Sequence, residues 1–321
     1  MKRIFYTVIA IGMLLISSCS QEEGVDIIRG EDQMVTFNVE IPMTESRTVG
    51  GFTIGSGVHA DKLMYAIYEA DKEVVLYKGI VSDTEHGTAD DSKFTITIPM
   101  AKNVKYDLLF FAYNESHCAF DITAGVNTNL KRLKFKDIQT PNVDAFDAFV
   151  GSLKAHGVED DNRVILKRPF AQVNAATTIN DLGYAASLQT EVTQSCLVIK
   201  GIPQYYDILE GTASGSIDKV VYQATNIMTC DDNNAPYRRE VITVNGIDYR
   251  WLTLAYVLAG DVNSVSTHNA VFLFMRNDGD EKVISTLDID HLPIQRNYST
   301  NVVGTLLTKS KEYTIWIDYD F

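Results

Sequence analysis

Cysteine and histidine are scarce in this 321-residue sequence, which has four cysteines and six histidines. The cysteines form no CxxC pair and the histidines no HxH or HExxH pair, so the clustered ligands of a zinc site are missing. The sequence also has no GxSxG elbow around a nucleophilic serine and no GxxxxGK loop for phosphate. These absences argue against a metalloenzyme, a serine hydrolase and a nucleotide-binding enzyme. We expect no catalytic residue, no cofactor and no metal site.

Basic residues are also few, with 28 Lys and Arg against 42 Asp and Glu and a net charge of −14. Nucleic acids are bound by clustered basic residues, so we expect no nucleic-acid partner. The acidic pairs at 90–91, 160–161 and 231–232 lie in turn-like sequence, which favours solvated turns over the paired carboxyls of a glycosidase. Residues 231–234 have the oxygen ligands of a weak calcium loop, without the spacing of an EF-hand.

The long apolar run of the sequence, residues 4–16, is too short for a comfortable membrane span. It follows Lys2 and Arg3, as in a secretory signal. The next residues, Ile-Ser-Ser-Cys at 16–19, resemble the lipobox of bacterial lipoproteins. We therefore expect a signal peptide at 1–18, a lipidated Cys19 and a polar tether at 19–32. Several acyl chains on one residue hold a protein firmly at a membrane.

The acidic residues 21–23 resemble the export tract of surface-exposed lipoproteins in Gram-negative gut anaerobes. The chain is expected at the outer membrane, tethered by lipid and facing outward.

The remaining sequence is rich in short alternating segments typical of β-strands. In the first half these segments are residues 35–41, 62–69, 74–81, 94–98 and 106–113. From about residue 163 a second set follows, at 163–166, 170–177, 196–199, 215–222, 240–244, 251–258, 271–276, 282–289 and 313–319. Helical turns are confined to 143–150 and 179–187. Short, regularly spaced strands predict a mainly β protein of two β-sandwich domains, at 33–160 and 161–321.

Aromatic residues and the three later cysteines have two interpretations each. Tyr205, Tyr206, Trp251 and Trp316 can line a strand core or stack on a glycan, and core packing is the more common role. Cysteines 118, 196 and 230 lie near strand-like sequence, which favours small buried hydrophobes. A disulfide between two of them is the alternative.

Three motifs carry a resemblance to a known family: RPFAQVN at 168–174, the stretch 202–215 with its Ile-Pro and Ser-Gly pairs, and QRNYSTN at 295–301 leading into 304–308. Together with the lipobox and the two β-domains, they make the chain similar to the fimbrillin family, the subunits and accessory proteins of type V pili. The resemblance implies two tandem transthyretin-like β-sandwiches. In polymerising members, an arginine-specific protease removes the first strand and a neighbour's donor strand fills the groove.

Carried onto this sequence, the resemblance implies that residues 35–41 form the displaced strand, which we expect at the edge of its sheet. Four of its side chains lie on the buried face: Val35, Phe37, Val39 and Ile41. Arg47 stands in the loop that follows and is the candidate processing site. The alternative is an ordinary loop arginine in a lipoprotein that is never cut.

The candidate C-terminal donor strand alternates Tyr313, Ile315, Ile317 and Tyr319. Polymerising subunits carry extra strand sequence beyond the folded domain, and no such sequence follows residues 313–319 here. The segment is therefore also a candidate for the closing strand of the second sandwich. That departure favours an anchor, tip or stand-alone adhesin role over a stalk subunit. The expected partners are other fimbrial subunits or a host or bacterial surface receptor. A stand-alone glycan- or protein-binding lipoprotein is the alternative function.

Overall fold

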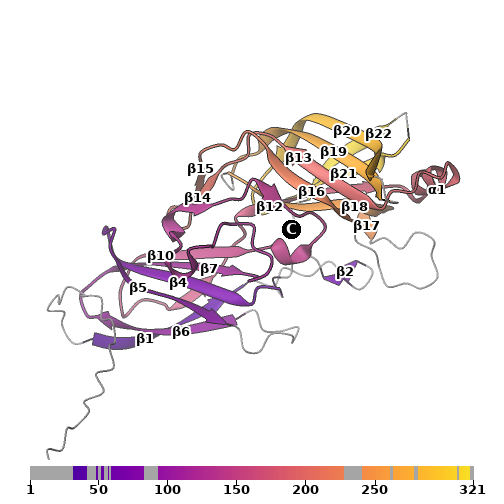
Figure 1. Ribbon diagram of the computed structural model, residues 1–321. Coiled ribbons are helices and arrows are strands. Elements are labelled where there is room, and N and C mark those ends of the chain that lie inside the picture. Colours follow the sequence, from indigo (N-terminus) through magenta and orange to yellow (C-terminus); the bar gives the residue numbers. More distant parts are fainter. Residues whose placement is uncertain are drawn as a thin grey trace, which may run out of the picture.

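The computed structural model describes residues 32–41, 48–49, 52–53, 57, 59–82, 93–227, 241–260, 263–277, 281–308 and 311–318. The chain is mainly β, with strands in two stacked pairs of sheets and a few short helices (Figure 1). None of the helices in these ranges is long and apolar enough to cross a membrane.

The first sandwich stacks a three-stranded sheet on a four-stranded one. The first sheet has the order β11-β1-β6, with β11 (Arg163–Ile165), β1 (Asp32–Glu40) and β6 (Lys93–Ala101). The second has the order β10-β7-β4-β5, with β10 (Phe149–His156), β7 (Tyr106–Tyr113), β4 (Lys62–Glu69) and β5 (Val75–Ser82). Apolar side chains from both sheets form one core between them.

The second sandwich has two five-stranded sheets. One has the order β17 (Val241–Val244), β18 (Ile247–Leu258), β12 (Phe170–Thr177), β21 (Ser299–Thr305) and β22 (Glu312–Asp318). The other has the order β20 (Glu281–Ile294), β19 (Ser266–Asn277), β13 (Gln194–Ile199), β16 (Val220–Asn226) and β9 (Ile138–Gln139). The α-helix α1 (Ile179–Ser187) is capped by the preceding Thr178, whose hydroxyl accepts a hydrogen bond from the Asp181 amide.

The segment between β7 and β10 joins the two sandwiches. It contains the 3₁₀ helices η1 (Gly125–Asn127), η2 (Leu130–Arg132) and η3 (Asp144–Phe146), and the short strand β8 (Leu133–Lys134). Strand β8 pairs with β14 (Tyr205–Asp207), which pairs with β15 (Thr212–Ser214). Two further short strands, β2 (Thr48–Val49) and β3 (Phe52–Thr53), form a hairpin.

Strand β7 is buried along its whole length because both of its faces are covered. Leu108 and Phe110 face the core of the first sandwich, whereas Leu109 and Phe111 belong to the core that extends through the joining segment into the second sandwich. The near-continuous apolar sequence of this strand is therefore explained by two cores rather than one.

Three expectations from the sequence need correction. The helical turn expected at 143–150 is limited to η3, and Phe149 already begins β10. Residues 163–165, expected to open the second domain, pair in parallel with residues 38–40 of β1 in the first sandwich. Strand β1 is therefore not a simple edge strand, since β6 and β11 flank its C-terminal third. The division of the chain at residue 160 stays a prediction.

Candidate functional site: the groove of strand β1

Strand β1 has one apolar and one polar face. Val35, Phe37, Val39 and the following Ile41 are each at most 3% exposed, whereas Met34, Thr36 and Asn38 point outward. This period-two pattern is what a strand on a solvent-facing sheet requires. The predicted inward set is thus buried in the first sandwich.

The groove that holds β1 is lined by aromatic and aliphatic side chains. The ring of Phe37 lies 6.3 Å from that of Phe110 and 5.4 Å from that of His156, centre to centre. The same core contains apolar side chains of the strands beside β1 and of the facing sheet: Phe94, Ile96, Ile98, Val164 and Leu166 from the first, and Leu63, Ile67, Leu108 and Phe149 from the second. The groove therefore has apolar pockets at alternate positions along β1.

The backbone of β1 is paired more extensively on one side than on the other. Strand β6 pairs antiparallel with all nine residues, from Asp32 opposite Ala101 to Glu40 opposite Lys93. Strand β11 pairs with residues 38–40, and the amide of Leu166 donates to the Glu40 carbonyl at 2.9 Å. Two strands thus supply backbone partners to β1, β6 along its whole length and β11 at residues 38–40.

The outward face of β1 makes two specific side-chain contacts. The hydroxyls of Thr36 and Thr97 are hydrogen-bonded at 2.9 Å. Arg163 donates from Nε and Nη2 to Glu40 Oε2, at 3.0 and 2.8 Å. The residues around β1 therefore contact both the inward and the outward face of this strand.

Ile41 packs at the end of the groove against a glycine. Gly57 has a φ of +75°, and a β-carbon there would lie 2.6 Å from Ile41 Cγ2. The predicted lipidation residue Cys19 and the predicted processing residue Arg47 both lie outside the described residues.

Strand β22, the candidate donor, is paired antiparallel with β21 along all seven of its residues. It borders its sheet, and β21 is its neighbour among the strands that the structure describes. Tyr313 is exposed, while Ile315 and Ile317 are half-buried. In the structure β22 is thus the closing strand of the second sandwich; Tyr319 lies outside the described residues.

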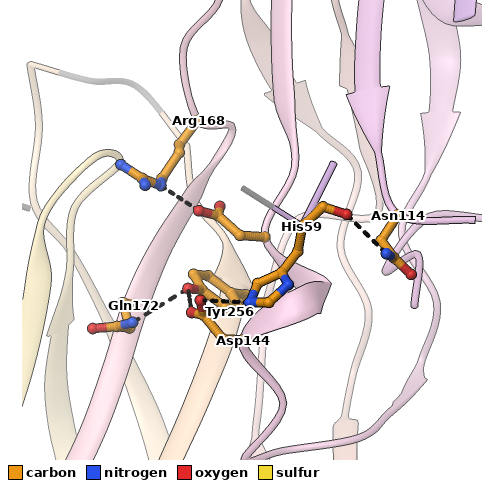
Figure 2. A network of polar contacts seen from close by, with 7 residues as sticks. His59, Asn114, Asp144, Arg168, Gln172 and Tyr256 are labelled. Atoms are coloured by element: carbon orange, nitrogen blue, oxygen red, sulfur yellow. Dashed lines mark hydrogen bonds and ion pairs between the residues drawn. The ribbon is translucent and has the colours of Figure 1, made fainter. Parts of the chain in front are cut away.

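A polar network lies where the two sandwiches meet (Figure 2). Arg168 Nε donates to Asp147 Oδ2 at 2.7 Å, and both side chains are buried. Burial raises the pKa of Asp147 to about 6, an effect that the neighbouring Arg168 charge opposes only in part. The Tyr256 hydroxyl donates to Asp144 Oδ1 at 2.5 Å.

The same network reaches the surface through the loop before β4. His59 Nε2 lies 3.6 Å from Asp144 Oδ2, and Asn114 Nδ2 donates to the His59 carbonyl at 2.8 Å. On the other side Gln172 Nε2 donates to the Tyr256 hydroxyl at 3.4 Å. Figure 2 shows these residues converging from the two sandwiches, so the network acts as a joint between them. The sequence did not predict this polar network, because its residues are spread along the chain from 59 to 256.

A family model described as a family of unknown function, DUF6562, matches residues 29–321. The chain belongs to DUF6562. No curated protein matches this member of the family.

Solved structures similar to the DUF6562 chain include ones described as fimbrial proteins and as putative cell adhesion proteins. The tip fimbrial protein Mfa3 from Porphyromonas gingivalis is 10% identical, with a TM-score of 0.43 over 90% of this chain and 99% of that one. A putative cell adhesion protein from Bacteroides uniformis is 12% identical, with a TM-score of 0.46 over 89% and 99%. A fimbrial assembly protein from Parabacteroides distasonis is 9% identical, with a TM-score of 0.44 over 90% and 99%.

The aromatic residues proposed for glycan stacking are not brought together in the DUF6562 chain. Tyr206 and Trp251 are buried in the core. Tyr205 lies in β14, and the Arg132 guanidinium covers one face of its ring at 4.1 Å. Trp316 is exposed on β22, in a different sheet from Tyr205. The interpretation as core residues holds for Tyr206 and Trp251.

The cysteines of the DUF6562 chain that the structure describes, Cys118 and Cys196, are buried. Burial raises the pKa of the Cys118 thiol to about 11, so this thiol stays protonated and is a poor nucleophile. Both residues fit the prediction of small buried hydrophobes; Cys230 lies outside the described residues. Among described residues no three His, Cys, Asp or Glu side chains are grouped to hold a metal.

Proposed function

We propose that this chain is a lipid-anchored cell-surface protein that acts in fimbrial assembly or adhesion through the addition of a β-strand. The observation that carries the proposal is the groove of β1. It has apolar pockets at alternate positions and backbone partners on both sides, which are the features that recognition by strand addition uses.

The burial of β1 makes an empty groove unfavourable. Burying one such apolar side chain contributes about 1.5–3 kcal/mol, so the four inward side chains contribute about 6–12 kcal/mol. This is comparable to the whole stability of a typical domain, about 5–15 kcal/mol. Loss of β1 therefore requires another strand in its place, and the vacated groove drives the assembly.

Processing at Arg47 is the proposed route by which β1 is released. Arg47 follows the last inward residue, Ile41, by six positions, so a cut there separates β1 from the rest of the first sandwich. The acylated Cys19 would then leave together with β1, and the trimmed protein would be free of its lipid.

A second role is favoured by the strand pairing within the chain. Strand β22 is paired along its full length and β1 is held on both sides at residues 38–40. A chain that keeps β1 and its lipid would serve as an anchor or as a stand-alone adhesin that binds a protein or glycan.

N-terminal sequencing and intact-mass analysis of the protein from its native cell surface, compared with an Arg47→Ala variant, test the proposal. If β1 is removed, the wild type begins at Thr48 without lipid and forms high-mass polymers. The variant retains acylated Cys19 and stays small. If both proteins begin at acylated Cys19, assembly through release of β1 is wrong and the anchor or adhesin role stands.

A further inference from the structure

Residues 162–168 carry the chain from the first sandwich to the second, and we call them the crossing segment. They include β11 of the first sandwich and end two residues before Phe170 opens β12 of the second. Their last residue, Arg168, belongs to the polar joint between the sandwiches (Figure 2). The crossing segment therefore has one end beside β1 and the other end in the joint.

The first end of the crossing segment is paired with β1. Among the strands that the structure describes, β11 pairs with β1 only, opposite residues 38–40. The Asn38 amide donates to the Asn162 carbonyl at 3.1 Å. The Leu166 amide donates to the Glu40 carbonyl at 2.9 Å, and the Arg163 guanidinium donates twice to the Glu40 carboxylate. The backbone pairing of this end thus depends on β1.

The second end of the crossing segment is held by β10 and by the joint. Lys167 and Val150 exchange both of their backbone hydrogen bonds, each at 2.8 Å. Arg168 donates from Nε to Asp147, and its carbonyl accepts a hydrogen bond from Arg296 Nε at 2.8 Å. This end therefore contacts residues of both sandwiches.

A side-chain route runs beside the backbone route. A β-carbon on Gly57 would lie 2.6 Å from Ile41 Cγ2 and 3.1 Å from the Phe149 ring, so both side chains pack against this glycine. The Arg168 guanidinium lies 4.9 Å from the centre of the Phe149 ring. Contacts thus continue from the last inward residue of β1 to the charged pair of the joint.

Complete seating of β1 is what gives β11 its strand partner. Residues 32–40 all pair with β6, whereas only residues 38–40 also pair with β11. A strand that fills only the first part of the groove therefore leaves β11 unpaired. Backbone groups without partners are costly when buried, so a three-residue strand in that state moves toward water. Packing of Leu166 against Gly151 of β10 keeps the segment near the sandwich without pairing the backbone of β11.

We infer that the crossing segment couples complete seating of the strand in the β1 groove to the joint between the two sandwiches. With the strand fully seated, β11 is paired and Arg168 is held beside Asp147. With the groove empty or partly filled, β11 loses its partner and the contacts of the joint weaken. The role of this coupling in assembly rests on the proposed function: the two sandwiches are fixed to each other only in a subunit whose groove is filled to its end.

Hydrogen exchange at single amides of the uncut mature chain, followed by NMR, tests the inference. Arg163→Glu sets like charges opposite each other at the exposed edge of β11 and leaves the joint itself unaltered. We expect exchange up to about fivefold faster at the Lys167 and Val150 amides, and at the Ala259 amide, which bonds the Pro169 carbonyl. The double variant Glu40→Arg with Arg163→Glu restores the attraction and should return these amides to the wild-type rate.

A control on the other side of β1 separates the coupling from a general weakening of this strand. Thr97→Val removes the hydrogen bond between Thr36 and β6. It should leave exchange at the Lys167 and Val150 amides unchanged, because it does not touch β11.

The coupling should also act in the reverse direction, because coupling between two sites is reciprocal. Asp147→Asn weakens the joint and should accelerate exchange of the Asn38 amide, which bonds Asn162, by about fivefold. The amides of β1 that pair with β6 should keep their wild-type rates.

The outcomes distinguish this inference from the proposed function. If Arg163→Glu accelerates exchange only within residues 163–165, or equally in β4 and β7, the coupling inference is wrong and release of β1 is unaffected. Failure of the double variant to restore the wild-type rates also contradicts the coupling. The proposed function fails separately, if the wild type taken from its cell surface still begins at acylated Cys19.

Discussion

At the scale of single residues, the joint between the sandwiches contrasts with the groove of β1. The groove is filled by apolar side chains, whereas the joint buries a charged pair, Asp147 and Arg168. A buried ion pair contributes little net stability when desolvation is counted, but removal of one partner is costly. In addition, Asp147 Oδ1 is buried and has no hydrogen-bond partner, which disfavours the ionised carboxylate.

The stability of the protein should therefore depend on pH through Asp147. Its pKa of about 6 in the folded chain lies above the ordinary value of 3.8, so folding favours the neutral carboxyl. This contribution is fully present below the ordinary pKa and is lost as the pH rises through about 6. We expect the free energy of unfolding of the wild type, relative to Asp147→Asn, to fall between pH 4 and 8. Urea titrations across this range measure it, and parallel curves for the two proteins would contradict the prediction.

At the scale of elements, a carboxylate on α1 accepts hydrogen bonds from the segment that connects β21 to β22. Asp181 Oδ2 accepts hydrogen bonds from the amides of Leu306 and Leu307, both at 2.8 Å, and from the Thr177 hydroxyl at 2.6 Å. These amides belong to residues between β21 and β22. We therefore expect the contact to limit how much of the chain detaches when β22 separates from β21.

Substitution of Asp181 should loosen β22 selectively. Asp181→Ala removes the carboxylate acceptor of two buried amides, of which the Leu306 amide keeps a 3.4 Å hydrogen bond to the Thr177 hydroxyl. A buried amide left without an acceptor costs about 1–3 kcal/mol. Asp181→Asn keeps one acceptor oxygen and serves as the control. Hydrogen exchange should become faster in residues 311–318 of the alanine variant than in β12 or β18. Equal acceleration in all three strands would mean that Asp181 stabilises the sandwich as a whole.

Elements with a clear local pattern were predictable. The alternation at 35–41, the apolar run at 106–113 and the helix at 179–187 are confirmed as β1, β7 and α1. Strands β8, β9, β14 and β15 were missed, because two or three residues are too few to show a period. Strand β21 was recognised only as a motif, since its polar residues 299–301 are buried in the sheet rather than exposed.

At the scale of the whole molecule, the two sandwiches share a core. Phe111 of β7 stacks on Tyr113 and packs edge-on against Phe120, which in turn stacks on Phe170 of β12. This continuous aromatic contact joins the outer face of the first sandwich to the second.

Unfolding should consequently be a single cooperative transition. The two tryptophans, Trp251 and Trp316, both lie in the second sandwich, so their fluorescence reports on it, while circular dichroism reports on all strands. Phe111→Ala should lower the free energy of unfolding by about 3–5 kcal/mol and shift both signals together. Ile165→Ala, at an exposed position of β11, is the control. Separate midpoints for the two signals would show that the sandwiches unfold independently.

The sequence by itself determined the mainly β character, the strands with regular alternation and the apolar face of β1, because these depend on residues a few positions apart. Only the tertiary structure decided that residues 163–165 flank β1, that Arg163 and Thr97 contact its outer face, and that Asp147 is buried beside Arg168. Strand partners and buried charges depend on residues that are brought together across the chain, and no local pattern specifies which strand will lie next to which.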